Sequence, residues 1–323
     1  MHMNLDKYAV CIDLGGTAIK GALVDGRGKI YFRQQLPTQK EKGLEHVAKQ
    51  LLLLVEKLET SVTAKKNGIL GIGIGIPGWV RSREGYVELA PNLGWKNINL
   101  RTFFEDKITL PIYFENDANL AALGEAWAGA GSGFSDFLFM TIGTGVGSGL
   151  IVQKKLYTGY SGFGSEIGHL QMVPKGVKCG CGNYGCLETV ASATALVRRA
   201  KEEIAKGAKT ALAKFPELEA KDIFTCALQN DLIAQKLVAE VADYLSAAIM
   251  NVALLLDIPL IVLGGGVSAA GDILLQPVRK MLEEKMHMLP QKIPQVMIAK
   301  LGNDAGLLGA ARLVFNPERE MER

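Results

Sequence analysis

The 323-residue chain is too long for one small hydrophobic core, and its length is typical of two packed domains. Hydrophobic residues make up 48% of it and charged residues 21%, which excludes intrinsic disorder as the main state. The formal net charge of +3 is small, and bases are interleaved with acids, so no surface for nucleic acid or an acidic membrane is indicated.

The N-terminal segment and the most apolar segment indicate whether the protein is secreted or spans a membrane. The first residues, Met1–Lys7, lack the apolar core of a secretion signal, so we expect a cytoplasmic protein. The most apolar region, residues 245–267, is interrupted by Asn251, Asp257 and Pro259 and by a triple glycine. It therefore predicts a buried helix followed by a buried strand rather than a membrane span.

The first part of the chain predicts a meander of three strands followed by mixed helices and strands. Apolar runs joined by glycine-bearing turns predict strands at residues 8–14, 19–24 and 29–36. Leu and Val at helical spacing predict a helix over residues 44–58. The other elements expected here are strands at 69–76 and 111–114 and a helix from about Asp117 to Ala128.

The second part of the chain restarts this pattern. A strand at 136–141, a glycine-rich turn and a strand at 149–153 follow each other, and residues 141–152 match 13–24 at a shift of 128 positions. The other elements expected here are helices near 191–205 and 231–256, a strand at 259–263 and a last helix from about Asp304 to Phe315. The identity between the repeats is slight, so chance could produce it, but a duplicated domain is the simpler account.

These elements predict an α/β protein of two lobes that meet over a cleft. We expect an N-terminal lobe of residues 1–116, which the C-terminal helix at about 304–323 joins, and a C-terminal lobe of residues 117–303.

Two turns rich in glycine and threonine stand at matching places in the repeat. They are Gly15-Gly16-Thr17 and Gly143-Thr144-Gly145. Glycine lets successive backbone N–H groups point toward one anion, although ordinary hairpin turns also use it. The matching positions favour phosphate binding. Neither turn fits the P-loop pattern or the dinucleotide fingerprint, which disfavours those nucleotide folds.

Two aspartates stand at the ends of predicted strands. Asp13 precedes the first turn, where it could cap the turn. A carboxylate beside a phosphate would repel the phosphate unless Mg²⁺ lay between them. We therefore expect Asp13 to belong to the magnesium shell. Asp117 stands where a strand leads into a helix and could be an ordinary N-cap. The helix N-terminus also favours an ionised carboxylate, which suits a general base for a substrate hydroxyl.

Three of the five cysteines lie within eight residues, in the segment CGCGNYGC. Nine residues separate His169 from Cys179, and Cys181 and Cys186 follow. Three thiolates and one imidazole complete a closed tetrahedral Zn²⁺ shell, which indicates a structural metal; a redox pair or inert thiols are the alternatives. The isolated Cys11 and Cys226 are expected to fill the core.

Two glutamates flank the cysteine loop. Glu166 precedes it in GSEIGH, and Glu188 follows it in CLET. A loop held by zinc could direct both carboxylates toward a polyhydroxylated substrate, or each could simply be exposed. The residues alone leave both interpretations open.

Together these segments resemble a known family, that of bacterial repressors, open reading frames and sugar kinases (ROK), and within it the bacterial glucokinases. The resemblance covers about residues 8–315. The segments that carry it, in chain order, are DLGGTAIKGALVD, GIPGWV, APNLGW, ENDANLAALGEAWAGAG, TIGTGVGSGLI, GSEIGH, CGCGNYGCLE and VLGGGV. It implies a two-lobed kinase of the actin-like (ribonuclease H-like) fold that binds ATP, Mg²⁺ and a hexose.

The resemblance also implies roles for individual residues. Asp117 would accept the proton of the sugar's 6-hydroxyl. The residues expected to bind the other sugar hydroxyls are Gly78, Asn116, Glu166, His169 and Glu188, with His169 serving zinc and sugar alike. Those expected around the phosphates are Gly15, Gly16, Thr17, Lys20, Thr144 and Gly145, and those expected beside adenosine are Gly265 and Gly266.

The activity expected from this resemblance is transfer of the γ-phosphoryl group of ATP to O6 of glucose. Mannose, N-acetylglucosamine or N-acetylmannosamine are alternative substrates, and polyphosphate is an alternative phosphoryl donor. A non-catalytic sugar sensor is the rival of another class. The family's repressors carry a DNA-binding domain before the first glycine turn, and only twelve residues precede Asp13 here, which disfavours a repressor. Similar kinases are often dimers or tetramers, so we expect a homo-oligomer.

Overall fold

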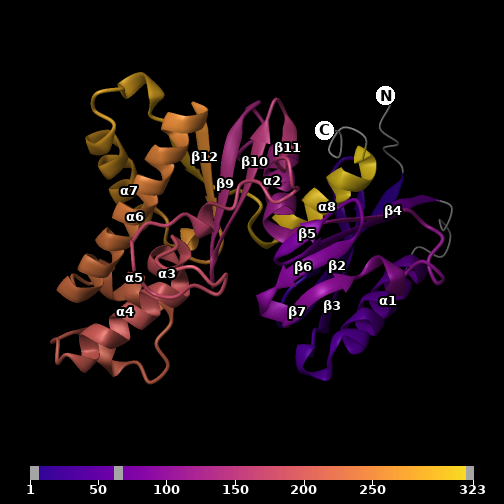
Figure 1. The fold of residues 1–323 in the computed structure, drawn as a ribbon, viewed down its shortest axis with the longest axis horizontal. Coiled ribbons are helices and arrows are strands. Elements are labelled where there is room, and N and C mark those ends of the chain that lie inside the picture. The colour runs from indigo at the N-terminus through magenta and orange to yellow at the C-terminus, as the bar shows by residue number, and fades with distance from the viewer. Residues whose placement is uncertain (1–6, 62–67, 318–323) are drawn as a thin grey trace. The chain divides into compact units, whose positions relative to one another are not determined.

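The computed structural model describes residues 7–61 and 68–317 (Figure 1). The chain folds into two compact units and contains two five-stranded sheets; residues 149–157, which belong to the second sheet, are counted with the first unit. The first unit consists of residues 1–135, 149–165 and 303–323, and the second of residues 136–148 and 166–302.

The sheet of the first unit has the strand order β3-β2-β1-β4-β8. Its strands are β1 (Tyr8–Leu14), β2 (Ala18–Asp25), β3 (Ile30–Pro37), β4 (Ile69–Ile76) and β8 (Ile112–Asn116). The first three form an antiparallel meander, while β1, β4 and β8 run parallel. Strand β4 reads ILGIGIGI because it is buried on both faces, as parallel strands usually are.

Three helices belong to this unit: α1 (Leu44–Thr60), α2 (Asp117–Ala128) and α8 (Ala305–Phe315). Figure 1 shows α1 beside β2 and β3, while α2 packs along α8. Helix α8 approaches β4 so closely that a Cβ on Gly73 would lie 2.5 Å from the Ala310 carbonyl oxygen. This close packing explains the alternating glycines of β4. A smaller antiparallel sheet follows, made of β5 (Trp79–Arg81), β6 (Tyr86–Ala90) and β7 (Trp95–Asn99).

The second sheet repeats the topology of the first, with the order β11-β10-β9-β12-β13. Its strands are β9 (Phe137–Ile142), β10 (Val146–Val152), β11 (Lys155–Tyr157), β12 (Leu260–Gly264) and β13 (Gln295–Ile298). In both sheets an antiparallel meander supplies three strands and two parallel strands complete the other side. The shared strand order supports the duplicated domain expected from the sequence.

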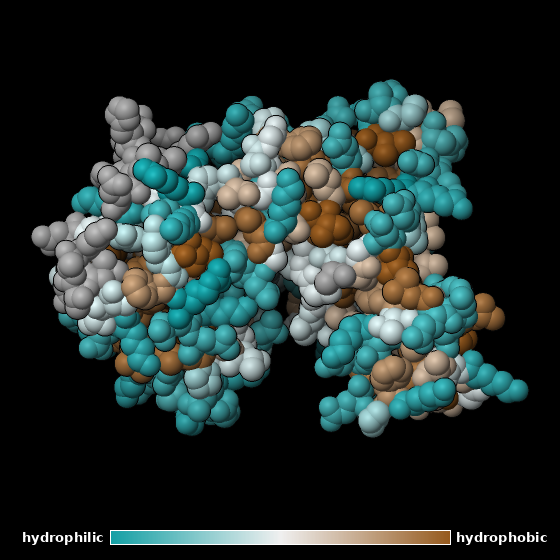
Figure 2. Space-filling view, turned by 180° about the vertical axis from the view of Figure 1, so that it is seen from behind, coloured by the Kyte–Doolittle hydropathy of each residue, from teal (hydrophilic) through white to brown (hydrophobic). Residues whose placement is uncertain are grey.

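The second unit also contains α3 (Glu188–Ala191), α4 (Ala193–Ala205), α5 (Ala220–Leu228), α6 (Leu232–Leu256) and α7 (Asp272–Lys285). By length and composition α6 could cross a membrane, but 56% of its most apolar window is buried inside the structure, where it packs on α4, α5 and α7. Hydrophobic residues lie in separate patches among hydrophilic ones on the face drawn in Figure 2. Helix α6 is therefore the buried helix that the sequence predicted.

Most of the predicted elements are confirmed, with shifts of a few residues at their ends. The second strand of the later repeat begins earlier than expected, at Val146. The helices and strands that sequence reasoning missed are β5, β6, β7, β11, α3, α5, α7 and β13. Cys11 and Cys226 are buried in the core, as expected.

The expected lobe boundary after residue 116 differs from the observed division. Helix α2, from Asp117 onward, is counted with the first unit because it packs against α8, and the second unit begins at Asp136. The division into compact units does not test the limits of the two expected lobes, which stay a prediction. Residues 318–323 of the expected C-terminal helix lie outside the described residues.

Candidate active site and metal centre

Two of the site residues expected in the first unit, Asp13 and Asp117, lie at the carboxyl edge of its sheet. Asp13, Gly75 and Glu115 are register neighbours on the adjacent parallel strands β1, β4 and β8. Neighbouring strands lie about 4.8 Å apart, so chain segments that leave these strands together line one edge. Asp117 follows β8 at this edge. In open α/β sheets, ligands bind at the carboxyl ends of the strands.

Asn116, rather than Asp117, caps helix α2. The Asn116 side-chain oxygen accepts hydrogen bonds from the backbone N–H groups of Ala118 (2.9 Å) and Asn119 (3.0 Å). Its amide nitrogen donates to the carbonyl oxygen of Gly78 at 2.9 Å, which brings two of the expected sugar-binding residues together. Asp117 is the first residue of the helix, and its carboxylate accepts from the Ala118 N–H at 2.9 Å. The ordinary capping role considered for Asp117 is thus filled by its neighbour.

A buried carboxylate that sequence reasoning missed lies directly before these residues. Glu115 is 3% exposed and accepts hydrogen bonds from the Ser82 hydroxyl (2.8 Å), the Asn116 N–H (2.8 Å) and the Asn119 side-chain amide (2.9 Å). Burial raises the pKa of Glu115, and these three donors oppose the rise. The residue joins the loop after β5 to the start of α2. Its position before Asn116 and Asp117 is the one sequence signal that could have singled it out.

The first glycine turn is held by the segment that follows β3. The Gly15 N–H donates to the Ala18 carbonyl oxygen (3.0 Å), and the Thr38 hydroxyl donates to the Gly15 carbonyl oxygen (2.6 Å). The Thr38 N–H also donates to the Thr17 carbonyl oxygen at 2.9 Å, while Thr17 itself is exposed. A Cβ on Gly16 would lie 3.2 Å from a backbone oxygen, so this turn has little room for a larger residue.

Asp13 and Lys20 lie opposite each other on β1 and β2, beside this turn. Burial raises the pKa of Asp13, and the positive charge of Lys20 opposes the rise. The Asp13 carboxylate also faces Gly306, in the first turn of α8. A half-buried carboxylate next to one ammonium group suits a site where a cation meets phosphate oxygens.

The second glycine turn lies in the second unit, between β9 and β10. Its Thr144 is exposed, as Thr17 is in the first turn. The expected adenosine-side residues, Gly265 and Gly266, follow β12 and are also exposed. The Val267 N–H donates to the Ile142 carbonyl oxygen at 2.9 Å, so this loop is fixed beside the start of the turn.

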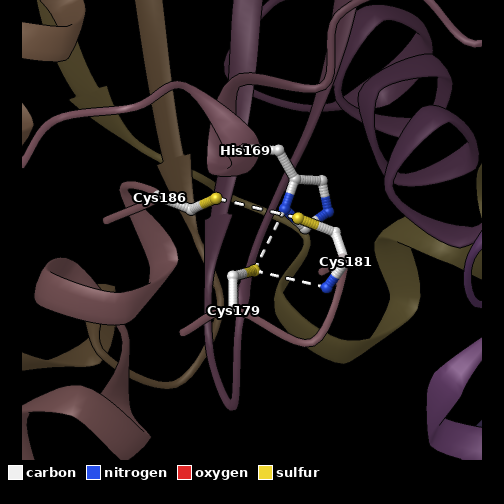
Figure 3. Close-up of side chains that lie close together, drawn as sticks. All are labelled: His169, Cys179, Cys181 and Cys186. Atoms are coloured by element: carbon white, nitrogen blue, oxygen red, sulfur yellow. Dashed lines mark hydrogen bonds between the residues drawn. The ribbon is translucent and has the colours of Figure 1, made fainter. Parts of the chain in front are cut away.

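The histidine and three cysteines of the expected zinc site come together in the second unit. Figure 3 shows His169, Cys179, Cys181 and Cys186 pointing toward one another, and their ligand atoms all lie within 4.8 Å of each other. The Cys181 and Cys186 sulfurs are 3.7 Å apart, and the Cys179 sulfur is 3.6 Å from His169 Nδ1. None of these cysteines forms a disulfide within the described residues.

These distances fit one tetrahedral zinc ion. Zn–S bonds of about 2.3 Å and Zn–N bonds of about 2.0–2.1 Å place sulfurs about 3.8 Å apart and sulfur and nitrogen about 3.6 Å apart. Burial, together with the nearby Glu188 carboxylate, raises the pKa of Cys179, and burial raises that of Cys186. Thiolates in such surroundings need a cation beside them. The four residues therefore suit a closed metal site.

The two glutamates of uncertain role are both placed beside His169. Glu166 Oε2 lies 4.0 Å from His169 Nε2, and Glu188 Oε1 lies 3.8 Å from His169 Nδ1. Glu188 also accepts a hydrogen bond from the Cys179 thiol at 2.8 Å. Both carboxylates are only partly exposed, which disfavours the interpretation that they are simply solvated.

The structure thus assembles two groups of expected site residues, one in each unit. The first unit holds Gly78, Asn116 and Asp117 near one another and the first glycine turn with Asp13 and Lys20. The second unit holds the other group: Thr144, Gly145, Glu166, His169, Glu188, Gly265, Gly266 and the three clustered cysteines. Their roles in binding and catalysis stay predictions.

Comparison with known proteins decides the family. Residues 9–316 match the ROK family. The chain belongs to the ROK family. It is 39% identical over 325 residues to a glucokinase of Halalkalibacterium halodurans, covering 98% of each chain. It is also 30% identical to the xylose repressor of Caldicellulosiruptor bescii, covering 98% of this chain and 80% of the repressor.

A solved ROK structure confirms the fold. The glucokinase from Streptomyces griseus, solved in complex with glucose and AMPPNP, is 35% identical to this chain and superimposes on it with a TM-score of 0.80. The match covers 95% of this chain and 98% of the S. griseus chain. The ROK protein described here has the two-lobed actin-like fold expected from its sequence.

Proposed function

We propose that this ROK protein transfers the γ-phosphoryl group of ATP to O6 of glucose, with Asp117 as the general base. The glucokinase relatives support a sugar kinase, and the solved relative with AMPPNP supports ATP as the phosphoryl donor. The observation that carries the proposal is the start of α2, where Asn116 caps the helix and leaves Asp117 as its first residue. A carboxylate held there can take a hydroxyl proton while the oxygen attacks phosphorus.

The residues around Asp117 would orient the sugar. Asn116 uses its side-chain oxygen for the helix and one amide hydrogen for Gly78, so its second amide hydrogen can reach a sugar oxygen. Glu166, His169 and Glu188 would bind further hydroxyls from the second unit. Positioning of this kind accounts for much of the rate enhancement in phosphoryl transfer.

Two metals belong to the proposal. Asp13 would hold the Mg²⁺ that accompanies ATP, which neutralises charge on the phosphates, while Lys20 would face the same phosphates. Zn²⁺ on His169, Cys179, Cys181 and Cys186 would be structural, because four protein ligands leave no open position. It would fix the ring of His169 so that the other ring nitrogen meets the sugar.

The test is a comparison of kcat/KM for glucose, mannose, N-acetylglucosamine and N-acetylmannosamine, with Mg·ATP and the purified protein. The highest value for glucose is expected. A higher value for one of the other sugars would keep the kinase and change its substrate. Polyphosphate in place of ATP tests the alternative phosphoryl donor.

A sugar sensor without activity is the second candidate, since the family includes repressors such as that of C. bescii. A sensor has no need of a general base, so Asp117 favours the kinase. Sugar binding without turnover on any of the four sugars would favour the sensor. We expect the enzyme in the cytoplasm and as a homo-oligomer, a dimer or tetramer.

A further inference from the structure

The loop that carries the expected metal ligands is in direct contact with the second glycine turn. The four metal ligands lie in a loop whose two ends, here called the first arm (Ile167–His169) and the second arm (Cys186–Ala193), return to the β9–β10 hairpin. The hairpin segment that they meet is Gly143–Ser148, which includes the glycine turn. All of these residues belong to the second unit.

The first arm packs on the side of the hairpin that leads into β10. The Ile167 N–H donates a hydrogen bond to the Ser148 hydroxyl at 3.1 Å. A Cβ on Gly168 would lie 1.8 Å from the Val146 carbonyl oxygen, so the two backbones touch without an intervening side chain. The next residue is the metal ligand His169. The ligand is thus one residue away from a backbone contact with Val146.

The second arm packs on the turn itself. The Ala193 N–H donates to the Gly143 carbonyl oxygen at 2.8 Å. A Cβ on Gly145 would lie 2.6 Å from Glu188 Oε2, while Glu188 Oε1 contacts the Cys179 sulfur. Glu188 thus lies between the metal ligands and the turn, two residues beyond the ligand Cys186. The turn is held from both sides by the loop that carries the ligands.

We infer that the metal site and the second glycine turn are energetically coupled, so that metal occupancy sets the affinity for the phosphates of the nucleotide. A metal bound to His169 and Cys186 joins the two arms to each other, and the arms fix the turn from both sides. The inference rests on the proposed function, which places nucleotide phosphates at Thr144 and Gly145. Coupling between two binding sites is reciprocal, so the nucleotide must strengthen metal binding by the same factor.

The first experiment measures the Kd of Mg·AMPPNP, without sugar, for protein loaded with one Zn²⁺ per chain and for protein stripped by a chelator. Removal of zinc should raise this Kd at least about five-fold, the lower end of typical coupling between linked sites. Competition with a chelator should show that AMPPNP raises zinc affinity by the same factor. Equal Kd values for the two forms would overturn the coupling. Failure of the zinc-loaded protein to bind AMPPNP at all would overturn the proposed function, and the coupling with it.

A variant keeps the test decisive if stripping the metal unfolds the protein. Ser148→Ala removes the hydrogen bond to the first arm, and Ser148 is not itself an expected ligand of metal or nucleotide. It should weaken both zinc and AMPPNP binding by about five-fold, the effect of one lost hydrogen bond. Ser246→Ala is the matched control, because this buried hydroxyl donates a hydrogen bond to the Asp243 carbonyl oxygen of its own helix, α6. Unchanged zinc and AMPPNP affinities in Ser148→Ala would overturn the inference.

Discussion

The buried carboxylate of Glu115 offers a sharp test of how the start of α2 is held. In Glu115→Ala, two donors lose their acceptor: the partly buried Asn116 N–H and the buried Asn119 side-chain amide. Each costs about 1–3 kcal/mol, whereas the Ser82 hydroxyl can turn to another partner. Relief from burying a carboxylate offsets part of this cost. We therefore expect Glu115→Ala to lower the free energy of unfolding by about 2–4 kcal/mol.

Glu115→Gln keeps an acceptor for both donors and should behave differently. Burial raises the pKa of Glu115 in the folded protein, so the folded state binds more protons than the unfolded state above the pKa of an unfolded glutamate, about 4.3. The wild-type protein accordingly loses stability as pH rises from there through the folded pKa. Glutamine does not titrate. The stability of Glu115→Gln relative to wild type should therefore increase over that pH range.

Urea unfolding at several pH values, followed by tryptophan fluorescence, measures both effects. All three tryptophans, Trp79, Trp95 and Trp127, lie in the first unit with Glu115, so the signal reports the unit in question. Glu105→Gln, at an exposed position, is the matched control and should show no such trend. A loss below about 1 kcal/mol in Glu115→Ala, or a relative stability of Glu115→Gln that falls with pH, would refute the reasoning.

Two further predictions concern the metal and the helix cap. Elemental analysis should find about one zinc per chain. Cys186→Ser should release the zinc and weaken sugar affinity, whereas the control Cys226→Ser should do neither. A fully active protein without zinc would contradict the assignment of the metal site. Asn116→Ala should cost about 1 kcal/mol through the lost cap of α2 and should also weaken glucose binding in calorimetry. Asp231→Ala, which removes the cap of α6, should lower stability alone; unchanged glucose affinity in Asn116→Ala would exclude Asn116 from the sugar site.

The parts of the fold that the sequence predicts well are those set by local pattern. Each of these signals lies within a few consecutive residues. Examples are the apolar runs of β1 and β4 and the glycine-bearing turns between strands. Strands β5 and β7 were missed because they are short and lack a regular alternation of buried and exposed residues. Helix α7 contains Pro277, which argues against a helix in a sequence although the structure accommodates it.

In the candidate site, too, residues set by local pattern can be predicted and residues set by the fold cannot. The sequence could bring the four expected zinc ligands together because three of them lie within one short loop and the fourth shortly before it. Glu115 is not, because a glutamate in a sequence is expected at the surface, and only the fold supplies its three hydrogen-bond donors. The contact of Gly168 with Val146 depends on backbone packing between segments more than twenty residues apart, which no local pattern encodes.

The proposed phosphoryl transfer requires Asp117 as the base for the sugar hydroxyl. Single-turnover phosphorylation of glucose by Asp117→Asn, with glucose affinity measured on the same sample, tests it directly. The variant should bind glucose with near wild-type affinity and transfer the phosphoryl group about 10²-fold more slowly or worse. Turnover at a rate near that of the wild type would contradict the mechanism.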